Sequence, residues 1–196
     1  MDLEKLLDNN FSWVENKDPE FFISISKGQS PSFLWIGCGD SRGCPNTITG
    51  CDLGEIFVNR NVANQVRSDD LNLMASLQFT VEVLKVKNII VCGHYACGGV
   101  NASFNADNGL SSVDNWIQPI RDLIKQNKVE LESIDEEVRP NRMVEINVLA
   151  QVQNLMQTET IKKAWANGNS LIIYGLVFDF ATGLLKKICE ETGGNE

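Results

Sequence analysis

Short apolar runs alternate along the chain with longer segments in which apolar residues recur every three or four positions. Short runs that stop at glycine or at a polar turn are typical of strands buried on both faces, whereas the longer spacing is typical of amphipathic helices. We predict strands at 33–36, 56–58, 88–92, 171–174 and 176–180. We predict helices over 69–85, 113–124, 144–155 and 159–167.

The first 30 residues have a different pattern. Residues 1–11 read as an amphipathic helix. Asp18 and Pro19 supply a side-chain cap and a first-turn proline for a second helix, which ends near Gly28. We therefore expect residues 1–30 to form an N-terminal helical arm.

Strands that alternate with helices favour an α/β fold with a mainly parallel central sheet flanked by helices. No repeat, linker or low-complexity tract divides the sequence, so we expect residues 1–196 to form a single domain. Reactive sites in such sheets lie beyond the carboxyl ends of the strands. Cys38 and His94 each stand where a predicted strand ends.

The balance of 17 basic and 26 acidic residues gives a net charge of −9. Because binding to phosphates or anionic lipid needs clustered basic residues, we expect neither a nucleic-acid partner nor a membrane partner. No apolar run is long enough for a membrane span, and the N-terminus does not resemble a secretion signal. We therefore expect a cytoplasmic protein.

His94 is the only histidine. A lone histidine is more often structural than a ligand, but Cys97 follows three residues later and Cys38 ends another predicted strand. Two thiolates and one imidazole suit zinc, and three protein ligands leave the fourth position open, as catalytic zinc requires. A closed structural site remains an alternative, with the fourth ligand drawn from the other thiols, Cys44, Cys51, Cys92 and Cys189.

Asp40 and Arg42 follow the first candidate ligand at short spacing. Asp40 could accept a hydrogen bond from a zinc-bound water or bind the zinc itself. Arg42 could pair with the carboxylate through two hydrogen bonds and keep it ionised. In isolation, such a pair would read as a solvated surface ion pair.

Three ordered motifs carry a resemblance to a known family: Cys38-x-Asp40-x-Arg42, the segment 54–64, and Gly93-His94-x-x-Cys97-Gly98-Gly99. Together they resemble the beta-class carbonic anhydrases over nearly the whole chain. The resemblance implies one zinc ion per subunit on Cys38, His94 and Cys97, with Asp40 as a possible fourth ligand in a closed state. It implies reversible hydration of CO2 to bicarbonate and a proton through a zinc-bound hydroxide, with the Asp40–Arg42 pair in the site.

The resemblance also implies a substrate pocket and an assembly. Gln29 is the candidate for a glutamine that bonds a substrate oxygen, reaching the site of a neighbouring subunit. The pocket would be lined by Phe57, Val62, Phe79, Gly98 and Gly99. The chain would form a homodimer or a higher even homo-oligomer, with the N-terminal arm packed on a partner subunit.

Two other functions fit the same residues. A hydrolase for carbonyl sulfide or carbon disulfide would use the same zinc hydroxide and the same apolar pocket. Departures from the family pattern at Gly39, Gly43 and Phe79 make a zinc-binding protein without catalysis a further alternative. By motif position Trp35, Arg60 and Phe178 would form a bicarbonate-binding set found in bacterial relatives. We favour core packing for Trp35 and Phe178.

Overall fold

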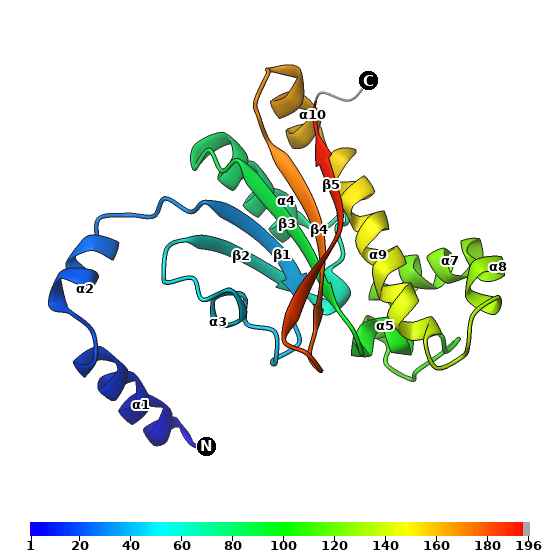
Figure 1. Ribbon diagram of the computed structural model, residues 1–196, viewed down its shortest axis with the longest axis horizontal. Helices are drawn as coiled ribbons and strands as arrows, with labels where there is room; N and C mark the ends of the chain where they lie inside the picture. Colours follow the sequence, from blue (N-terminus) through cyan, green and yellow to red (C-terminus); the bar gives the residue numbers. More distant parts are fainter. Residues whose placement is uncertain (194–196) are drawn as a thin grey trace. The chain divides into compact units, whose positions relative to one another are not determined.

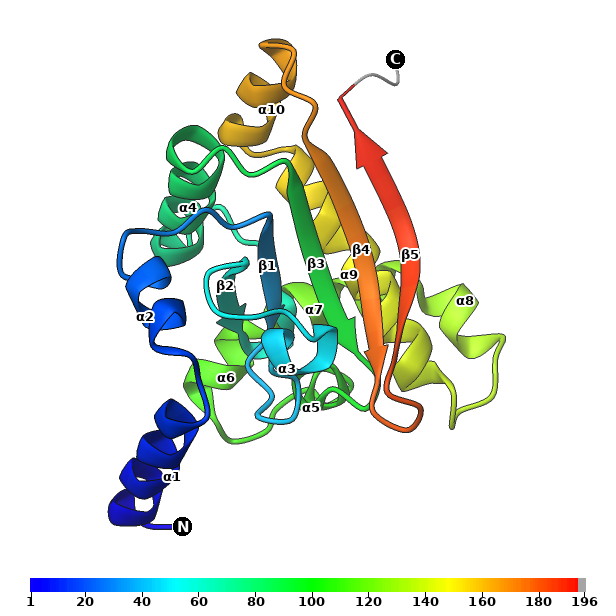
Figure 2. The ribbon, with the colours of Figure 1, turned by 60° about the vertical axis from the view of Figure 1, so that its left-hand side comes forward.

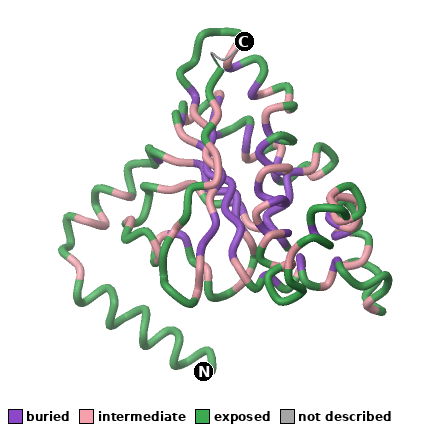
Figure 3. Tube along the Cα trace, turned by 45° about the vertical axis from the view of Figure 1, so that its right-hand side comes forward, coloured by how far each residue is buried: buried purple, intermediate pink, exposed green. Residues whose placement is uncertain are grey.

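The computed structural model describes residues 1–193, which fall into two compact units, residues 1–30 and residues 31–193. The first unit holds helices α1 (Leu3–Glu15) and α2 (Pro19–Ile25). The side chain of Asp18 caps α2 by accepting a hydrogen bond from the backbone N–H of Glu20. Helix α1 is exposed over its whole length (Figure 3). Both helices of the predicted arm are therefore confirmed.

In the described part of the second unit, five strands form one sheet in the order β2-β1-β3-β4-β5 (Figure 1). The strands are β1 (Phe33–Cys38), β2 (Ile56–Asn61), β3 (Asn88–His94), β4 (Ile172–Asp179) and β5 (Leu184–Thr192). The first four are parallel to one another, and β5 runs antiparallel to β4. The prediction of an α/β fold with a mainly parallel sheet is confirmed.

The helical segments of this unit connect and cover the strands. They are α3 (Pro45–Thr49), η1 (Val62–Asn64), α4 (Leu71–Gln78), η2 (Phe79–Val83), α5 (Gly98–Ala102), α6 (Ser111–Trp116), α7 (Gln118–Gln126), α8 (Lys128–Glu132), α9 (Arg139–Met156) and α10 (Glu159–Ala166). Within residues 1–193, no helix combines the length and apolar character that a membrane span requires.

Side chains alternate between the two faces of the sheet. Leu34 and Ile36 of β1 pack in the core formed with α4, α9 and α10, whereas Trp35 packs on the other face with residues of β3 and β4. Figure 2 shows α3 in front of the sheet and α9 behind it. Burial is concentrated in the strands and in α9 (Figure 3). The core thus fixes β1 and β3 beside each other.

Two of the predicted strands are one strand. The segments 171–174 and 176–180 join in β4, with Gly175 inside it. A Cβ at Gly175 would lie 2.7 Å from Cys189 Sγ and 3.0 Å from Val148 Cγ1, so this glycine permits close packing rather than a turn. The prediction also omitted β5, whose pattern is obscured because it is an edge strand rich in lysine and glutamate.

The helix predicted over 113–124 is two helices. Helix α6 ends at Trp116, and α7 begins at Gln118 with Pro119 in its first turn. Proline has no N–H to continue the hydrogen bonding of the preceding helix, and it is well placed in a first turn. The helix predicted over 69–85 begins as α4 and continues as the π-helical turn η2, where Leu84 N–H bonds Phe79 O.

Candidate metal centre

The sheet brings the three candidate ligands to one edge. Strands β1 and β3 are parallel neighbours with Gly37 opposite Cys92, so both end at the same edge. Cys38 is the last residue of β1 and His94 is the last residue of β3. After His94 the chain turns through Ala96, whose φ of 55° is rare for a residue with a side chain, and Cys97 then precedes α5.

The ligand atoms of Cys38, His94 and Cys97 all lie within 4.8 Å of one another. The two Sγ atoms are 3.9 Å apart. Two sulfurs bound at about 2.3 Å to a tetrahedral zinc ion would be separated by about 3.8 Å. His94 and Cys97 are buried, and Cys38 is half-buried. The sulfur spacing therefore fits zinc without rearrangement of the strands.

The imidazole of His94 is oriented for metal binding. Its Nδ1 lies 2.9 Å from the carbonyl oxygen of Tyr95, which can only accept a hydrogen bond. Nδ1 is therefore the protonated nitrogen, and Nε2 keeps a free lone pair. Within residues 1–193, Nε2 is buried and has no hydrogen-bond partner. A buried nitrogen acceptor without a partner beside two sulfurs is what a zinc ligand requires.

The two thiols have opposite protonation preferences. The hydrogen bond from Cys97 lowers the pKa of Cys38 against the opposing effect of burial, and the backbone N–H groups of Asp40 and Ala63 lower it further. The same contact with Cys38, together with burial, raises the pKa of Cys97. The lowered pKa of Cys38 favours the thiolate, the form of cysteine that binds metals.

A closed structural site finds no support in residues 1–193, which include all six cysteines. None of Cys44, Cys51, Cys92 and Cys189 joins the cluster of convergent ligand atoms. All six are free thiols. Burial raises the pKa of Cys92 to about 12, so this thiol on β3 stays protonated. The interpretation of a three-ligand site is thus favoured over a four-ligand one.

Asp40 lies beside the cluster and is held by Arg42. Arg42 Nε donates to Asp40 Oδ1 at 2.9 Å, and Arg42 Nη2 donates to Oδ2 at 2.7 Å. These bonds hold the pKa of Asp40 well below its usual range. Asp40 Oδ2 lies 3.7 Å from His94 Nε2. The carboxylate is therefore ionised, engaged with Arg42, and next to the ligand atoms without being one of them.

Two residues that support this loop were not predicted in that role. Arg60 donates through Nε to Cys38 O at 2.7 Å and through Nη2 to Asp40 O. The ring of Phe180 lies 4.2 Å from the guanidinium carbon of Arg42 and 5.0 Å from the ring of His94. Phe180 follows β4, the parallel neighbour of β3, and the rule that sites form at strand ends could have revealed it.

Trp35 and Phe178, considered above for a bicarbonate site, are 2% and 7% exposed and share one core cluster. Their interpretation as core residues is confirmed. The third member of that set, Arg60, uses its guanidinium to bind two backbone carbonyls.

The predicted pocket residues come from β2, from η1 directly after it, from η2 and from α5. The rings of Phe57 and Phe79 are 6.3 Å apart, and Val62 and Phe79 are each 43% exposed. A Cβ at Gly99 would lie 2.8 Å from Val62 Cγ1, so glycine lets α5 approach this loop closely. No such restriction applies at Gly98, which has open space around it. Their role in lining a substrate pocket stays a prediction.

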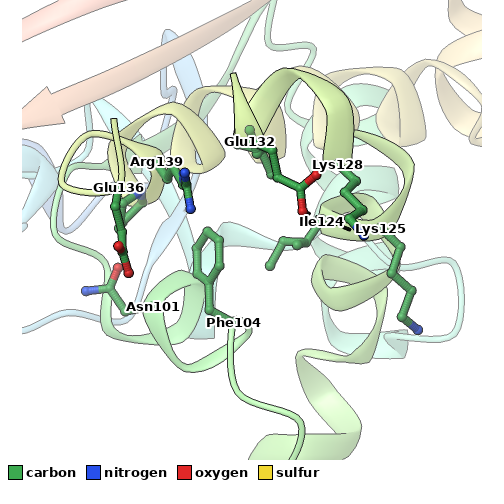
Figure 4. Close-up of a pocket in the computed structure, with 10 residues that line it drawn as sticks. Asn101, Phe104, Ile124, Lys125, Lys128, Glu132, Glu136 and Arg139 are labelled. Carbon is green, nitrogen blue, oxygen red and sulfur yellow. Dashed lines mark ion pairs between the residues drawn. The ribbon is translucent and has the colours of Figure 1, made fainter. Parts of the chain in front are cut away.

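Gln29 belongs to the first unit and is exposed, and its role also stays a prediction. A cavity of about 510 Å³ lies elsewhere, between α5, α7, α8 and α9 (Figure 4). Phe104 and Ile124 line it together with the ion pair of Lys128 and Glu132. None of the predicted site residues lines this cavity, so the candidate chemistry is located at the sheet edge.

The fold and the site define an α/β protein with a metal centre of two cysteines and one histidine. The family model for carbonic anhydrase matches residues 33–185. The chain is 41% identical over 189 residues to a carbonic anhydrase of Emericella nidulans, covering 94% of this chain and 82% of the relative. The chain belongs to the carbonic anhydrase family.

Solved structures place it in the beta class. A tetrameric beta-carbonic anhydrase from Sordaria macrospora superposes with a TM-score of 0.92 at 36% identity, covering 96% of this chain and 98% of that one. The Coccomyxa beta-carbonic anhydrase in complex with acetazolamide superposes with a TM-score of 0.94 at 38% identity, covering 98% and 89%. The predictions of the family, of a CO2-hydrating enzyme and of zinc as its cofactor are confirmed.

Proposed function

We propose that Asp40 is the hydrogen-bond acceptor that orients the attacking oxygen in the hydration of CO2 at this centre. The observation that carries the proposal is the position of Asp40, with Oδ2 at 3.7 Å from His94 Nε2 and both carboxylate oxygens held by Arg42. Cys38, His94 and Cys97 would hold the zinc, which would supply hydroxide at neutral pH by lowering the pKa of a bound water. An ionised Asp40 can only accept a hydrogen bond. It would therefore orient the attacking hydroxide by accepting a hydrogen bond from its O–H.

Arg42 and its neighbours keep this acceptor in place. The planar guanidinium matches the two carboxylate oxygens, and the ring of Phe180 packs on its face. Arg60 holds the carbonyls of Cys38 and Asp40, which fixes the backbone between ligand and carboxylate. Asp40 therefore needs little reorganisation during the reaction, and preorganisation of this kind contributes strongly to catalysis.

CO2 is neutral and apolar, so its binding requires an apolar wall and a few hydrogen-bond donors. We propose Phe57, Val62 and Phe79 as the wall and Gln29 as a donor to the oxygen on which negative charge develops. The attack would form a C–O bond while one C=O π bond of CO2 opens and its electron pair moves to an oxygen, which gives bicarbonate. The proton that the attacking water lost is left for export to the solvent.

A stopped-flow assay of CO2 hydration across pH, with zinc quantified in the same sample, tests this function. We expect one zinc per chain and hydration that acetazolamide inhibits. Parallel assays with carbonyl sulfide and carbon disulfide test the alternative hydrolase. Full zinc occupancy without CO2 hydration at high pH would instead identify a protein that binds zinc and lacks catalysis.

We propose that the active species is a homodimer or a higher even oligomer. The second unit exposes apolar side chains on edge strand β2 and next to it, at Val58, Val62 and Phe79. Exposed apolar surface of this kind is typical of subunit interfaces. The relative from Sordaria macrospora is tetrameric.

Mixed oligomers test whether Gln29 acts in a neighbouring subunit. We expect Gln29→Ala and His94→Ala to be poorly active when each is alone. Mixed assemblies of the two regain activity, because the intact metal centre of one chain receives Gln29 from the other. Absence of recovery in assemblies shown to be mixed would place Gln29 in its own subunit or outside the site.

Proton export should depend on external buffer. His94 is the only histidine, and its Nδ1 bonds the Tyr95 carbonyl while its Nε2 faces the metal cluster. No second imidazole exists to carry protons near neutral pH. At saturating CO2 we expect kcat to rise several-fold as an imidazole buffer is raised from millimolar to tens of millimolar. A kcat that is independent of buffer concentration would refute this.

We also propose that the protein works in the cytoplasm. Two metal-ligating thiols only 3.9 Å apart are best preserved in a reducing compartment. Fluorescence microscopy of the tagged full-length chain tests this, and a signal confined to another compartment would refute it.

A further inference from the structure

The loop after β2 contains two consecutive residues in a left-handed conformation. Ala63 has φ 62° and Asn64 has φ 47°, although neither is glycine. Such conformations persist only where the surroundings enforce them, and they are concentrated at functional sites. The structure shows what enforces them here.

Side chains bind most of the backbone polar groups of this loop. Asn61 closes it through both ends of its amide, which bonds Gln65 N–H and Gln65 O at 2.7 and 2.8 Å. Trp116 Nε1 donates to Val62 O at 2.8 Å. The loop is thus folded by specific side chains and not by regular secondary structure.

Three further hydrogen bonds to the backbone of this loop come from side chains on one face of α9. Asn147 Nδ2 donates to Ala63 O at 3.0 Å, Gln151 Oε1 accepts from Val66 N–H at 2.7 Å, and Asn154 Nδ2 donates to Val66 O at 3.1 Å. These three amides, at spacings of four and three residues, lie on one side of the helix. We call Asn147, Gln151 and Asn154 the amide ladder.

Within the amide ladder each side chain orients the next. Gln151 Nε2 donates to Asn147 Oδ1 at 2.9 Å, which turns Asn147 Nδ2 toward Ala63 O. Asn154 Nδ2 donates to Gln151 Oε1 at 3.1 Å. Asn147 is fully buried and Gln151 is 2% exposed. Buried amides are costly unless they are hydrogen-bonded, so this network has one favourable arrangement.

The loop also touches a metal ligand. Cys38 packs against the core cluster that contains Ala63 and Cys97, and the backbone N–H of Ala63 faces Cys38 and lowers the pKa of its thiol. Gly39 N–H, one residue after Cys38, bonds Asn61 O at 2.8 Å. Asn147 therefore binds the carbonyl oxygen of Ala63, the same residue whose N–H faces the sulfur.

We propose that Asn147 and Gln151 are positioning residues of the metal centre, which hold the Ala63 N–H against Cys38 Sγ and so tune the sulfur that binds zinc. The proposal rests on the zinc centre of the proposed function. A hydrogen bond to a thiolate withdraws electron density from it, so its loss changes the metal–sulfur bond. Mutation of groups that hydrogen-bond to metal ligands typically weakens metal affinity by about 10–100-fold.

Cobalt(II) loaded into the full chain in place of zinc gives a direct test, because thiolate-to-cobalt charge transfer reports on the sulfur. In Asn147→Leu and in Gln151→Leu we expect the charge-transfer band at longer wavelength and cobalt affinity about 10–100-fold weaker. Asn147→Ser, which keeps a hydroxyl too short to reach Ala63 O, provides a milder variant if Asn147→Leu does not fold.

Leu155→Ala is the matched control. Leu155 is fully buried on the same helix, so its truncation lowers the melting temperature without removing a bond to the loop. We expect its cobalt band and affinity to match the unmodified chain. An unmoved band in the Asn147 and Gln151 variants, with affinity no weaker than in Leu155→Ala, would overturn the proposal. Absence of a thiolate band in the unmodified cobalt protein would overturn the metal centre itself.

Discussion

Replacing Asp40 by asparagine is expected to lower kcat/KM for CO2 hydration by about 100-fold or more, the usual loss when one preorganised hydrogen-bonding group of an active site is removed. The amide has nearly the same shape as the carboxylate but lacks its charge. It also presents an NH2 group where Asp40 now accepts from Arg42. Zinc content should stay at one per chain, since Asp40 lies outside the cluster of ligand atoms.

The chain contains a matched control for this substitution. Arg67 binds Asp69 through Nε–Oδ1 and Nη2–Oδ2 at 2.9 and 2.7 Å, the same two distances as in the Arg42–Asp40 pair. Asp69→Asn therefore removes an equivalent ion pair just before α4, and we expect kcat/KM within about two-fold of the unmodified enzyme, as for a surface pair. Stopped-flow assays of CO2 hydration by the two variants measure this difference in kcat/KM. Near-normal rates in zinc-loaded Asp40→Asn would exclude Asp40 as the hydrogen-bond acceptor that orients the attacking oxygen.

Removing a metal ligand is expected to have the second large effect. His94→Ala should lose its zinc on dialysis against a chelator and lose CO2 hydration with it. Zinc that binds only the folded state stabilises it by about 4 kcal/mol when present at 1,000 times its dissociation constant. A change of this size moves the melting temperature of a chain of this length by roughly 10 °C. Added zinc should therefore raise the melting temperature of the unmodified chain and leave that of His94→Ala unchanged.

Cys92→Ala separates ligand loss from core disruption. Cys92 lies two residues before His94 on β3, is 4% exposed, and is outside the ligand cluster. We expect this variant to lose about 1 kcal/mol of stability and to keep its zinc and its activity. A zinc-dependent rise in melting temperature for His94→Ala as large as that of the unmodified chain would show that the metal binds elsewhere.

The positions of Cys38 and His94 could be predicted from the sequence because both follow short buried strands. Parallel strands end at a common edge, so two ligands at strand ends are brought together by topology alone. The helical arm was equally readable, since Asp18 and Pro19 give a strong helix-start signal. These features depend on local pattern, which a single sequence carries directly.

Other features depend on tertiary contacts and could not be read this way. Gly175 looked like a break between strands, whereas it accommodates Cys189 and Val148. Arg60 contributes to the site by binding the carbonyls of residues 22 and 20 positions before it, a relation that no local pattern expresses. The amide ladder did leave a signal, because Asn147, Gln151 and Asn154 recur at helical spacing. Only the apolar stripe of that helix entered the prediction.

Zinc K-edge X-ray absorption of the unmodified enzyme at neutral pH is the most direct test of the central claim, that Cys38, His94 and Cys97 hold one zinc with a position left for a reacting oxygen. The account predicts two sulfur neighbours at about 2.3 Å, one imidazole nitrogen, and one light atom at about 2.0 Å that exchanges with added anions. A third sulfur neighbour, or a first shell without sulfur, would contradict it.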